Sequence, residues 1–285
     1  MCIASNTVGE YLKSATDTLN KHSVPTARLD ALILMEFILG IDRAKILGNP
    51  DQTITRQQIN LFNQAIAERS KHMPIAYITH RTEFYGRTFY VDSNVLQPRP
   101  ETETMIDLFK SLVDGAPKYR KRLLLANDLH VADVGTGSGA IGITAKLEVK
   151  NIQIDLIDID LKALKVAKTN VVLHTIHANT ILADLLPNDD NSYDILLCNL
   201  PYIPDNFHIN LAAGHEPPIA IFGGKDGLDI YRKLFKLVSN IQHKPLYIFT
   251  EALPSSHLKL KTLAAMHDYV HMTTEDFIQL YKLHG

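Results

Sequence analysis

The segment from Val131 to Gly142 constrains most strongly what this chain can fold into. An apolar run, Val131-Ala132-Asp133-Val134, opens into Gly135-Thr136-Gly137-Ser138-Gly139, and a helical pattern follows. A strand that runs into alternating glycines lets a ligand approach the backbone closely at the carboxyl end of a parallel sheet. Nicotinamide and flavin enzymes use similar turns, so the glycines alone leave the ligand open.

Two later apolar runs end in an acidic residue. The run Ile154–Asp158 closes on Asp158, roughly twenty residues beyond the last glycine, where a carboxylate can accept both hydroxyls of a ribose. The run Thr180–Asp184 closes on Asp184, which is placed to accept from an adenine amino group. We expect Asp155 to be a solvated strand residue and Asp160 to be the N-cap of the next helix.

A further strand, Tyr193–Cys198, ends in Asn199-Leu200-Pro201-Tyr202. The Asn199 side-chain oxygen and the Leu200 carbonyl can accept from the two N–H groups of a planar amino group and fix its nitrogen for in-line attack. Pro201 restricts Leu200 to extended conformations and so aims that carbonyl, while Tyr202 can stack on the flat group. The acidic strand ends and this tetrad follow one another in what we expect to be sheet order, which favours an adenosyl ligand. The sequence therefore predicts an N-methyltransferase that uses S-adenosylmethionine.

Composition narrows the class of protein further. A chain of 285 residues can hold a large and a small domain, and a net charge of −2 argues against a strongly basic, nucleic-acid-binding surface. The two cysteines, Cys2 and Cys198, cannot build a disulfide framework or a thiolate zinc site, and the histidines lack ligand spacing. No apolar stretch is long enough to cross a bilayer and no leader pattern is seen. We expect a cytoplasmic protein without metal or membrane contact.

The first eighty residues have a helical pattern without strand alternation. Apolar side chains recur at helical spacing at Val8, Tyr11, Leu12, Ala15 and Leu19. A second helix is expected to start at Ser23 with Pro25 and to stop at Gly40. Thr55-Arg56-Gln57-Gln58 is a capping-box pattern that opens another helix. We expect a helical bundle over residues 1–80.

The pattern changes from Glu83 onward. A short hairpin is predicted over residues 83–91 and 94–96, inside a linker at 81–98. Pro98-Arg99-Pro100 enforces an extended segment, and a helix is expected to start at Glu101. The alternation of strands and helices that follows predicts a parallel, doubly wound α/β sheet over residues 99–285. Late strands near 245–251, 268–273 and 277–282 complete it, the last two as an antiparallel edge pair.

Several segments together resemble the HemK/PrmC group of methyltransferases over nearly the whole chain. They are Ala27-Arg28-Leu29-Asp30-Ala31, Glu83-Phe84-Tyr85-Gly86, Gln97 to Glu103, Asp133 to Gly139, Asn199 to Tyr202, Glu216-Pro217 and Gly224-Lys225-Asp226-Gly227-Leu228. The resemblance implies a Rossmann-like class I methyltransferase domain with a seven-stranded mixed sheet, preceded by an N-terminal helical domain that docks the substrate protein.

The resemblance also implies an activity and a set of residues. The family transfers a methyl group from S-adenosylmethionine to the amide nitrogen of the glutamine in the Gly-Gly-Gln motif of peptide-chain release factors. The implied cofactor-binding residues are Asp133, Gly135, Thr136, Gly137, Gly139, Asp158, Asp184 and Asn199. The implied catalytic residues are Asn199, Leu200, Pro201 and Tyr202, and the implied substrate-binding residues are Pro98, Arg99, Glu101, Asn199 and Tyr202. We expect a monomer whose partner is the release factor and which does not bind nucleic acid directly.

The tetrad departs from the family pattern and keeps other readings open. Leu200 stands where the family has proline, which removes a φ restraint worth about 1 kcal/mol at most but keeps the backbone carbonyl. Gln97 and the stretch Thr250 to Leu253 also differ from the family pattern. Asn-Leu-Pro-Tyr resembles the tetrad of ribosomal-RNA adenine dimethyltransferases as well, so a nucleic-acid N-methyltransferase stays an alternative. A catalytically weakened adaptor is a further alternative, and a nicotinamide dehydrogenase is the most distant one.

Overall fold

The computed structural model describes residues 6–115, 129–187 and 192–285. The chain divides into two compact units, one formed by Met1–His80 with Asn210–His215, the other by Arg81–Ile209 with Glu216–Gly285. Each unit has hydrophobic cores of its own, and each is described by itself below.

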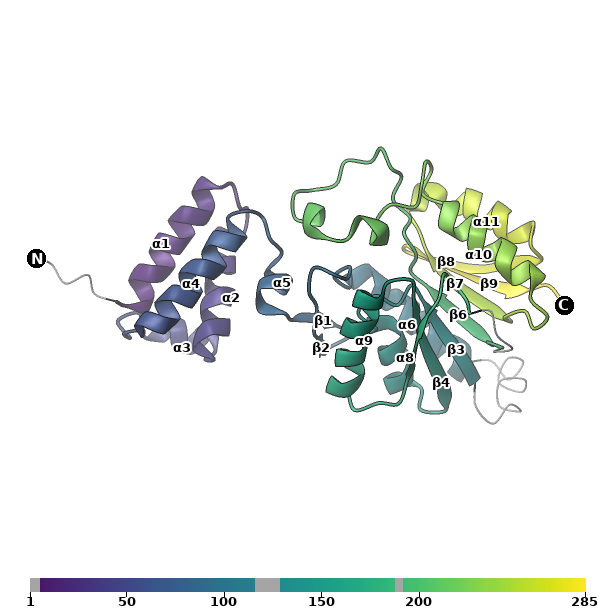
Figure 1. The fold of residues 1–285 in the computed structure, drawn as a ribbon, viewed down its shortest axis with the longest axis horizontal. Helices are drawn as coiled ribbons and strands as arrows, with labels where there is room; N and C mark the ends of the chain where they lie inside the picture. Colours follow the sequence, from purple (N-terminus) through teal and green to yellow (C-terminus); the bar gives the residue numbers. More distant parts are fainter. Residues whose placement is uncertain (1–5, 116–128, 188–191) are drawn as a thin grey trace, which may run out of the picture. The chain divides into compact units, whose positions relative to one another are not determined.

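The first unit is helical, as the sequence predicts. Its helices are α1 (Val8–Lys21), α2 (Ala27–Leu39), α3 (Arg43–Gly48), α4 (Arg56–Arg69) and α5 (Ile75–Thr79). Figure 1 shows α1, α2 and α4 packed along one another. Their common core includes Leu19, Met35 and Phe62. An apolar face on each helix is buried in this core, and that burial is what makes short helices stable.

Local signals in this unit are mostly confirmed. Thr55 and Gln58 form the predicted capping box, and Gly40 ends α2 with a left-handed φ of 66°. The second helix starts at Ala27 rather than near Ser23, so that part of the prediction is wrong. The carboxylate of Asp30, buried on α2, accepts from Arg69 Nε of α4 at 2.7 Å.

The second unit opens with a hairpin. Strands β1 (Thr82–Phe84) and β2 (Arg87–Phe89) pair antiparallel around Tyr85 and Gly86, which both take positive φ as a two-residue hairpin turn requires. Residues 94–96 form no strand, contrary to the prediction. Val95 lies instead in a turn, where its amide donates to the Asp92 carbonyl and its side chain is buried.

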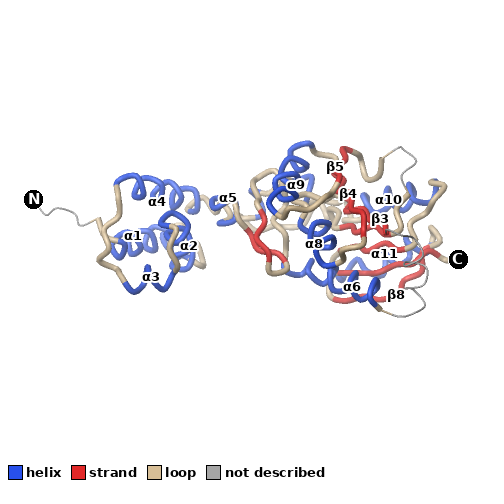
Figure 2. The backbone as a smooth tube through the Cα atoms, turned by 90° about the horizontal axis from the view of Figure 1, so that it is seen from below, coloured by secondary structure: helices blue, strands red, loops and turns tan. Residues whose placement is uncertain are grey.

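The seven-stranded mixed sheet is confirmed, with strand order β5-β4-β3-β6-β7-β9-β8. The strands are β3 (Leu129–Val134), β4 (Ile152–Asp158), β5 (Asn179–Leu182), β6 (Ile195–Cys198), β7 (Tyr247–Glu251), β8 (Tyr269–Glu275) and β9 (Ile278–Leu283). Strands β3 to β7 run parallel, and β9 lies antiparallel between β7 and β8. Figure 2 shows β3, β4 and β5 side by side.

The expected sheet order of the acidic strand ends is wrong. After β5 the chain returns to the other side of β3, so β6 pairs with β3 and not with β5. This reversal leaves a crevice at the carboxyl ends of the parallel strands, the place where open α/β sheets bind ligands. The actual order therefore brings the tetrad after β6 next to the glycine turn after β3.

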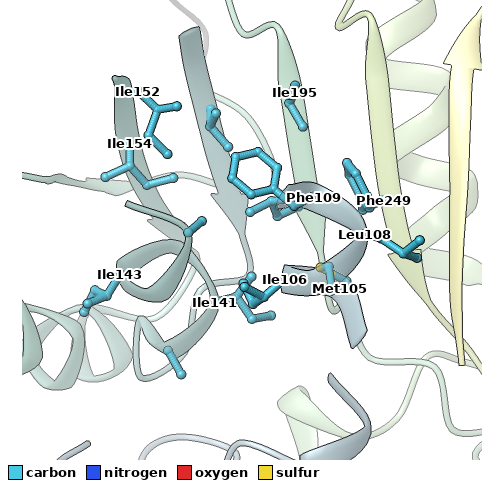
Figure 3. Packing of buried hydrophobic residues seen from close by; sticks show 14 of the residues in the cluster. Met105, Ile106, Leu108, Phe109, Ile141, Ile143, Ile152, Ile154, Ile195 and Phe249 are labelled. Carbon is cyan, nitrogen blue, oxygen red and sulfur yellow. The ribbon is translucent and has the colours of Figure 1, made fainter. Parts of the chain in front are cut away.

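Helices cover both faces of the sheet. On one face lie α6 (Glu103–Asp114), α8 (Ala140–Glu148) and α9 (Leu161–Leu173), and on the other α10 (Asp229–Asn240) and α11 (His257–Ala265). Figure 3 shows Phe109 of α6 and Ile141 of α8 among strand side chains in the hydrophobic core between the sheet and α6, α8 and α9. The helix expected from Glu101 begins as the 3-10 turn η1 (Pro100–Thr102), followed by α6. Other short 3-10 turns are η2 (Ala213–His215), η3 (Pro218–Ala220) and η4 (Pro254–Ser256).

Candidate active site

A cavity of about 260 Å³ lies in the second unit at the carboxyl ends of the parallel strands. Most of the predicted site residues line it, namely Pro98, Gly135, Thr136, Gly137, Asp158, Asp184, Asn199, Leu200 and Pro201. The other predicted residues do not line it, namely Arg99, Glu101, Asp133, Gly139 and Tyr202. Ile230 and Lys233 of α10, which sequence reasoning missed, contribute to its wall.

The glycine turn has a left-handed backbone conformation that residues with side chains rarely adopt. Gly135, Gly137 and Gly139 have φ values of 71°, 55° and 83°. A Cβ atom on Gly135 would lie 3.0 Å from Leu200 Cδ2, so this turn packs directly against the tetrad. The glycines therefore allow both the backbone conformation and the close approach of two strand ends.

Asp133 supports the turn from behind the cavity. Its Oδ2 accepts from the Thr136 hydroxyl at 2.6 Å and from the Gly142 amide at 2.9 Å, while Oδ1 is buried without a partner among the described residues. Burial raises the pKa of this carboxyl group to about 6, against the lowering effect of both donors. Asp133 thus stabilises the loop and does not face the cavity.

Asp158 ends β4 and faces the cavity. Its Oδ2 accepts from the Gly137 amide and its Oδ1 from the Asp160 amide, both at 2.9 Å. A carboxylate oxygen accepts more than one hydrogen bond, so both oxygens keep capacity for the hydroxyls of a ligand. Burial raises the pKa of Asp158, and the backbone donors lower it. Asp160 is the N-cap of α9, as predicted, and accepts from the Lys162 amide at 2.8 Å.

Asp184 follows β5 and forms an ion pair with Lys233 of α10. Both side chains are about half exposed, so this pair contributes little to stability. Lys233 places a cation at the end of the cavity where the sequence predicts the adenine group.

The tetrad is anchored by contacts to distant parts of the chain. The Asn199 Nδ2 atom donates to Thr102 Oγ1 at 3.3 Å, and the Tyr202 hydroxyl donates to Glu251 Oε1 at 2.9 Å. Leu200 is buried, and burial raises the pKa of Tyr202. Asn199 and Leu200 face the cavity, whereas Tyr202 is turned toward Glu251.

Tyr231 of α10 links the tetrad to the end of β7. Its hydroxyl is buried and lies 2.6 Å from the Glu251 carbonyl and 3.1 Å from the Cys198 carbonyl. It accepts from the Leu200 amide at 3.4 Å and from the Glu251 amide at 3.2 Å. One side chain therefore ties together the backbones on both sides of Asn199.

A glycine pair in the Gly223–Gly227 segment packs on the same tetrad. A Cβ on Gly223 would lie 2.3 Å from the Pro201 carbonyl oxygen, and one on Gly227 would lie 2.2 Å from that of Tyr202. No side chain fits there, so these glycines permit a close backbone approach. This explains physically why a glycine-rich segment accompanies the tetrad.

An ion pair between the partly exposed Arg99 and the buried Glu216 joins two cavity walls. Arg99 Nη2 lies 2.6 Å from Glu216 Oε2, and the Glu216 side chain is 1% exposed. The flanking residues Pro98 and Pro217 both line the cavity. Burial raises the pKa of Glu216, and Arg99 is the largest influence that lowers it. Arg99 therefore acts on the cavity wall through Glu216. The side chain of Glu101 is exposed.

Asp155 contradicts its expectation as a solvated residue. It is 1% exposed and accepts from His130 Nε2 at 3.1 Å, Asn179 Nδ2 at 2.8 Å and the Tyr193 hydroxyl at 2.9 Å. Burial raises its pKa, but the three donors together hold it below its usual range. These donors lie on other parts of the chain, which a strand pattern does not reveal.

Over the parts of the chain described here, no group of three or more His, Cys, Asp or Glu side chains is arranged to hold a metal ion. In the same residues no helix is long and apolar enough to cross a membrane. Cys198 is buried, which raises the pKa of its thiol well above the usual value.

The sheet, the glycine turn and the acid that ends β4 fit an adenosyl ligand. The cavity is lined by residues from the ends of four neighbouring strands: Asp184 after β5, Asp158 of β4, the glycine turn after β3, and Asn199 to Pro201 after β6. The positive φ values leave the backbone of the turn open to a ligand, and Asp158 has acceptor capacity at the ribose position. This fold and this site define an S-adenosylmethionine-dependent methyltransferase.

Comparisons with known proteins agree on the class and show the family. Residues 10–79 match the PrmC N-terminal domain, and residues 115–216 match the methyltransferase small domain. The release factor glutamine methyltransferase of Bacillus cereus is 35% identical over 77% of this chain and 77% of its own length. That of Leptospira interrogans is 34% identical over 74% of this chain and 73% of its own. The chain belongs to the HemK/PrmC family of methyltransferases.

Solved structures share the fold at low identity. The hMettl16 catalytic domain in complex with an RNA hairpin is 13% identical, with a TM-score of 0.53, and the match covers 81% of this chain and 82% of the other. The Thermus thermophilus 16S rRNA methyltransferase RsmC, solved with AdoMet and guanosine, is 14% identical, with a TM-score of 0.50 over 71% of this chain and 49% of the other. These similarities concern the fold alone.

Proposed function

We propose that this protein methylates the side-chain amide nitrogen of the glutamine in the Gly-Gly-Gln motif of peptide-chain release factors. The observation that supports this most directly is the position of Asn199 and Leu200 in the cavity wall, next to the glycine turn. The similarity to release factor glutamine methyltransferases over about three quarters of the chain supports the substrate.

When bound, S-adenosylmethionine supplies an electrophilic methyl group. Gly135 and Gly137 would hold it through the open backbone of the turn, and Asp158 through its free acceptor capacity. Asp184 would accept at the adenine end, beside Lys233. Asp133 and Gly139 shape the turn rather than contact the ligand.

The residues of the tetrad would act on the substrate nitrogen. An amide nitrogen is a poor nucleophile because its lone pair is delocalised. Acceptance of its two N–H bonds by Asn199 Oδ1 and the Leu200 carbonyl would fix its orientation and stabilise the positive charge that develops on it. Pro201 restricts Leu200, and Tyr202, held by Glu251, borders this group. Pro98, Arg99 and Glu101 would form the wall along which the substrate enters.

We further propose a division of labour within a monomer. Residues 1–80 would dock the release factor, residues 81–98 would link, and residues 99–285 would carry cofactor and glutamine. The match of residues 10–79 to the PrmC N-terminal domain supports the first role. Deletion of the helical residues is expected to raise KM for the release factor far more than KM for a short glutamine peptide.

The substrate is tested by transfer of a labelled methyl group. The chain is incubated with labelled S-adenosylmethionine and a purified release factor, beside a version whose Gly-Gly-Gln glutamine is alanine. We expect label in the first protein only, located on the glutamine by mass spectrometry. Label in the alanine version would contradict this substrate, and nuclease-sensitive label in an extract would favour a nucleic-acid methyltransferase.

A further inference from the structure

Glu251 is a buried carboxylate beside the tetrad with one oxygen unused. It ends β7 and is 1% exposed. Oε1 accepts from the Tyr202 hydroxyl at 2.9 Å, whereas Oε2 is buried and has no hydrogen-bond partner among the described residues. A buried acceptor left without a donor is costly, so it calls for a neighbouring hydroxyl or a functional reason.

Thr102 supplies the neighbouring hydroxyl. Its side chain is buried, and Oγ1 already receives the Asn199 Nδ2 proton at 3.3 Å. Burial raises the pKa of Glu251 and hydrogen bonding with the Thr102 side chain lowers it, although Oε2 has no hydrogen bond of ordinary geometry within the described part of the chain. Thr102 therefore interacts with both the Glu251 carboxylate and the Asn199 amide.

A threonine hydroxyl carries one hydrogen and two lone pairs. If the Thr102 hydroxyl donates its hydrogen to the Glu251 carboxylate, it can act toward Asn199 only as an acceptor. Asn199 must then turn its NH2 group to Thr102, and its oxygen is left for the cavity. An asparagine turned the other way would present N–H bonds to the N–H bonds of the substrate, which repel.

We propose that Glu251, acting through Thr102, is a positioning residue that sets which end of the Asn199 amide faces the substrate nitrogen. This inference rests on the proposed function, since it concerns a substrate that donates two N–H bonds. Neither residue contacts the reacting atoms. The role gives a function to the Glu251 oxygen that has no hydrogen-bond partner of ordinary geometry among the described residues.

The test compares Glu251→Gln, Thr102→Val and Thr102→Ser in methyl transfer to a release factor. The amide introduced by Glu251→Gln could donate to Thr102, which frees the threonine hydrogen for Asn199, so we expect kcat to fall about 10- to 100-fold. KM for S-adenosylmethionine should change less than about twofold, because the turn and Asp158 are untouched. Thr102→Val should lose a similar factor, and Thr102→Ser should regain most of it.

The double variant separates this relay from two independent structural effects. Glu251→Gln combined with Thr102→Val should be no slower than Thr102→Val alone, because both changes remove one interaction. Glu275→Gln, on an exposed carboxylate of β8, is the matched control and should keep wild-type turnover. Thermal unfolding of each variant shows that it is folded.

Wild-type kcat in Glu251→Gln, or multiplicative losses in the double variant, would overturn this inference alone. A wild-type chain that transfers no label to the release factor would overturn the proposed function, and this inference with it.

Discussion

Two buried carboxylates in the same sheet are satisfied very differently. Asp155 in β4 accepts from three side-chain donors, whereas Glu251 at the end of β7 accepts from Tyr202 and has one oxygen, Oε2, without a partner among the residues that the structure describes. The donors hold the pKa of Asp155 below its usual range, whereas burial raises that of Glu251. The fully bonded carboxylate stabilises the fold, whereas the under-bonded one, which accepts from Tyr202 of the tetrad, is the one to which we assign a functional role.

The largest effect is expected at the residue that Glu251 is proposed to orient. Asn199→Ala removes one of two acceptors for the substrate nitrogen, so kcat should fall about 10²- to 10³-fold while cofactor affinity changes little. Single-turnover kinetics and equilibrium cofactor binding separate the two quantities. Unchanged turnover would rule out the acceptor role.

Substitution of the fully bonded Asp155 should lower stability and leave kcat unchanged, the opposite of the result expected for Asn199→Ala. Asp155→Ala leaves His130, Asn179 and Tyr193 without their shared acceptor, and we expect the free energy of unfolding to fall by about 3 kcal/mol. The folded fraction should keep its kcat, as judged from urea unfolding and activity on the same preparation. A loss of kcat without a loss of stability would contradict a purely structural role for Asp155.

Asp133 gives a test that depends on pH. Its folded-state pKa of about 6 lies above the unfolded value, so its protonated form is favoured in the fold. This contribution is complete below about pH 4 and is lost as the pH rises through 6, by roughly 3 kcal/mol. Asp133→Asn should remove that decline in unfolding free energy between pH 4 and 7. Parallel pH profiles for both proteins would show that the carboxyl group does not titrate there.

Tyr231→Phe should have smaller effects, both on the free energy of unfolding and on turnover. The loss of the hydroxyl that ties Cys198 and Glu251 should lower the free energy of unfolding by about 1–2 kcal/mol and slow turnover several-fold. The matched control is Tyr269→Phe. The buried Tyr269 hydroxyl donates to the Pro245 carbonyl at 2.8 Å, and Tyr269 does not line the cavity. This variant should lose similar stability without loss of kcat, and equal kcat losses would contradict a role for Tyr231 in the tetrad.

The smallest effect is expected from Leu200→Pro, which restores the usual family residue. It fixes φ at 200 but removes an amide whose bond to Tyr231 is already long at 3.4 Å. These effects oppose each other, so kcat should stay within about threefold of the wild type. A tenfold gain would mean that loop order limits turnover.

The parts of the site that follow a local sequence pattern could be predicted from the sequence. The glycine turn, Asp158 and the tetrad each follow an apolar strand, and Gly135 to Ser138, Asp158 and Asn199 to Pro201 line the cavity. Glu251 obeys the same rule, an acid after the strand Tyr247–Thr250, and could have been found by applying it once more. Thr102, Tyr231 and Lys233 could not, since their roles arise from contacts 97, 31 and 49 residues away along the chain.

The expected sheet order and the expected solvation of Asp155 failed for a related reason. A strand pattern shows which residues are apolar but not which strand pairs with which, so the return of β6 to β3 is invisible in it. The burial of Asp155 likewise depends on donors that the fold brings from β3, from β5 and from Tyr193.

The most direct measurement is a ternary structure of this chain with S-adenosylhomocysteine and a Gly-Gly-Gln peptide. We expect the glutamine side-chain nitrogen to lie about 3 Å from both Asn199 Oδ1 and the Leu200 carbonyl oxygen, with Asn199 Nδ2 donating to Thr102. A glutamine nitrogen held elsewhere in the cavity, or an Asn199 whose NH2 group faces that nitrogen, would contradict the proposed roles of Asn199 and Leu200.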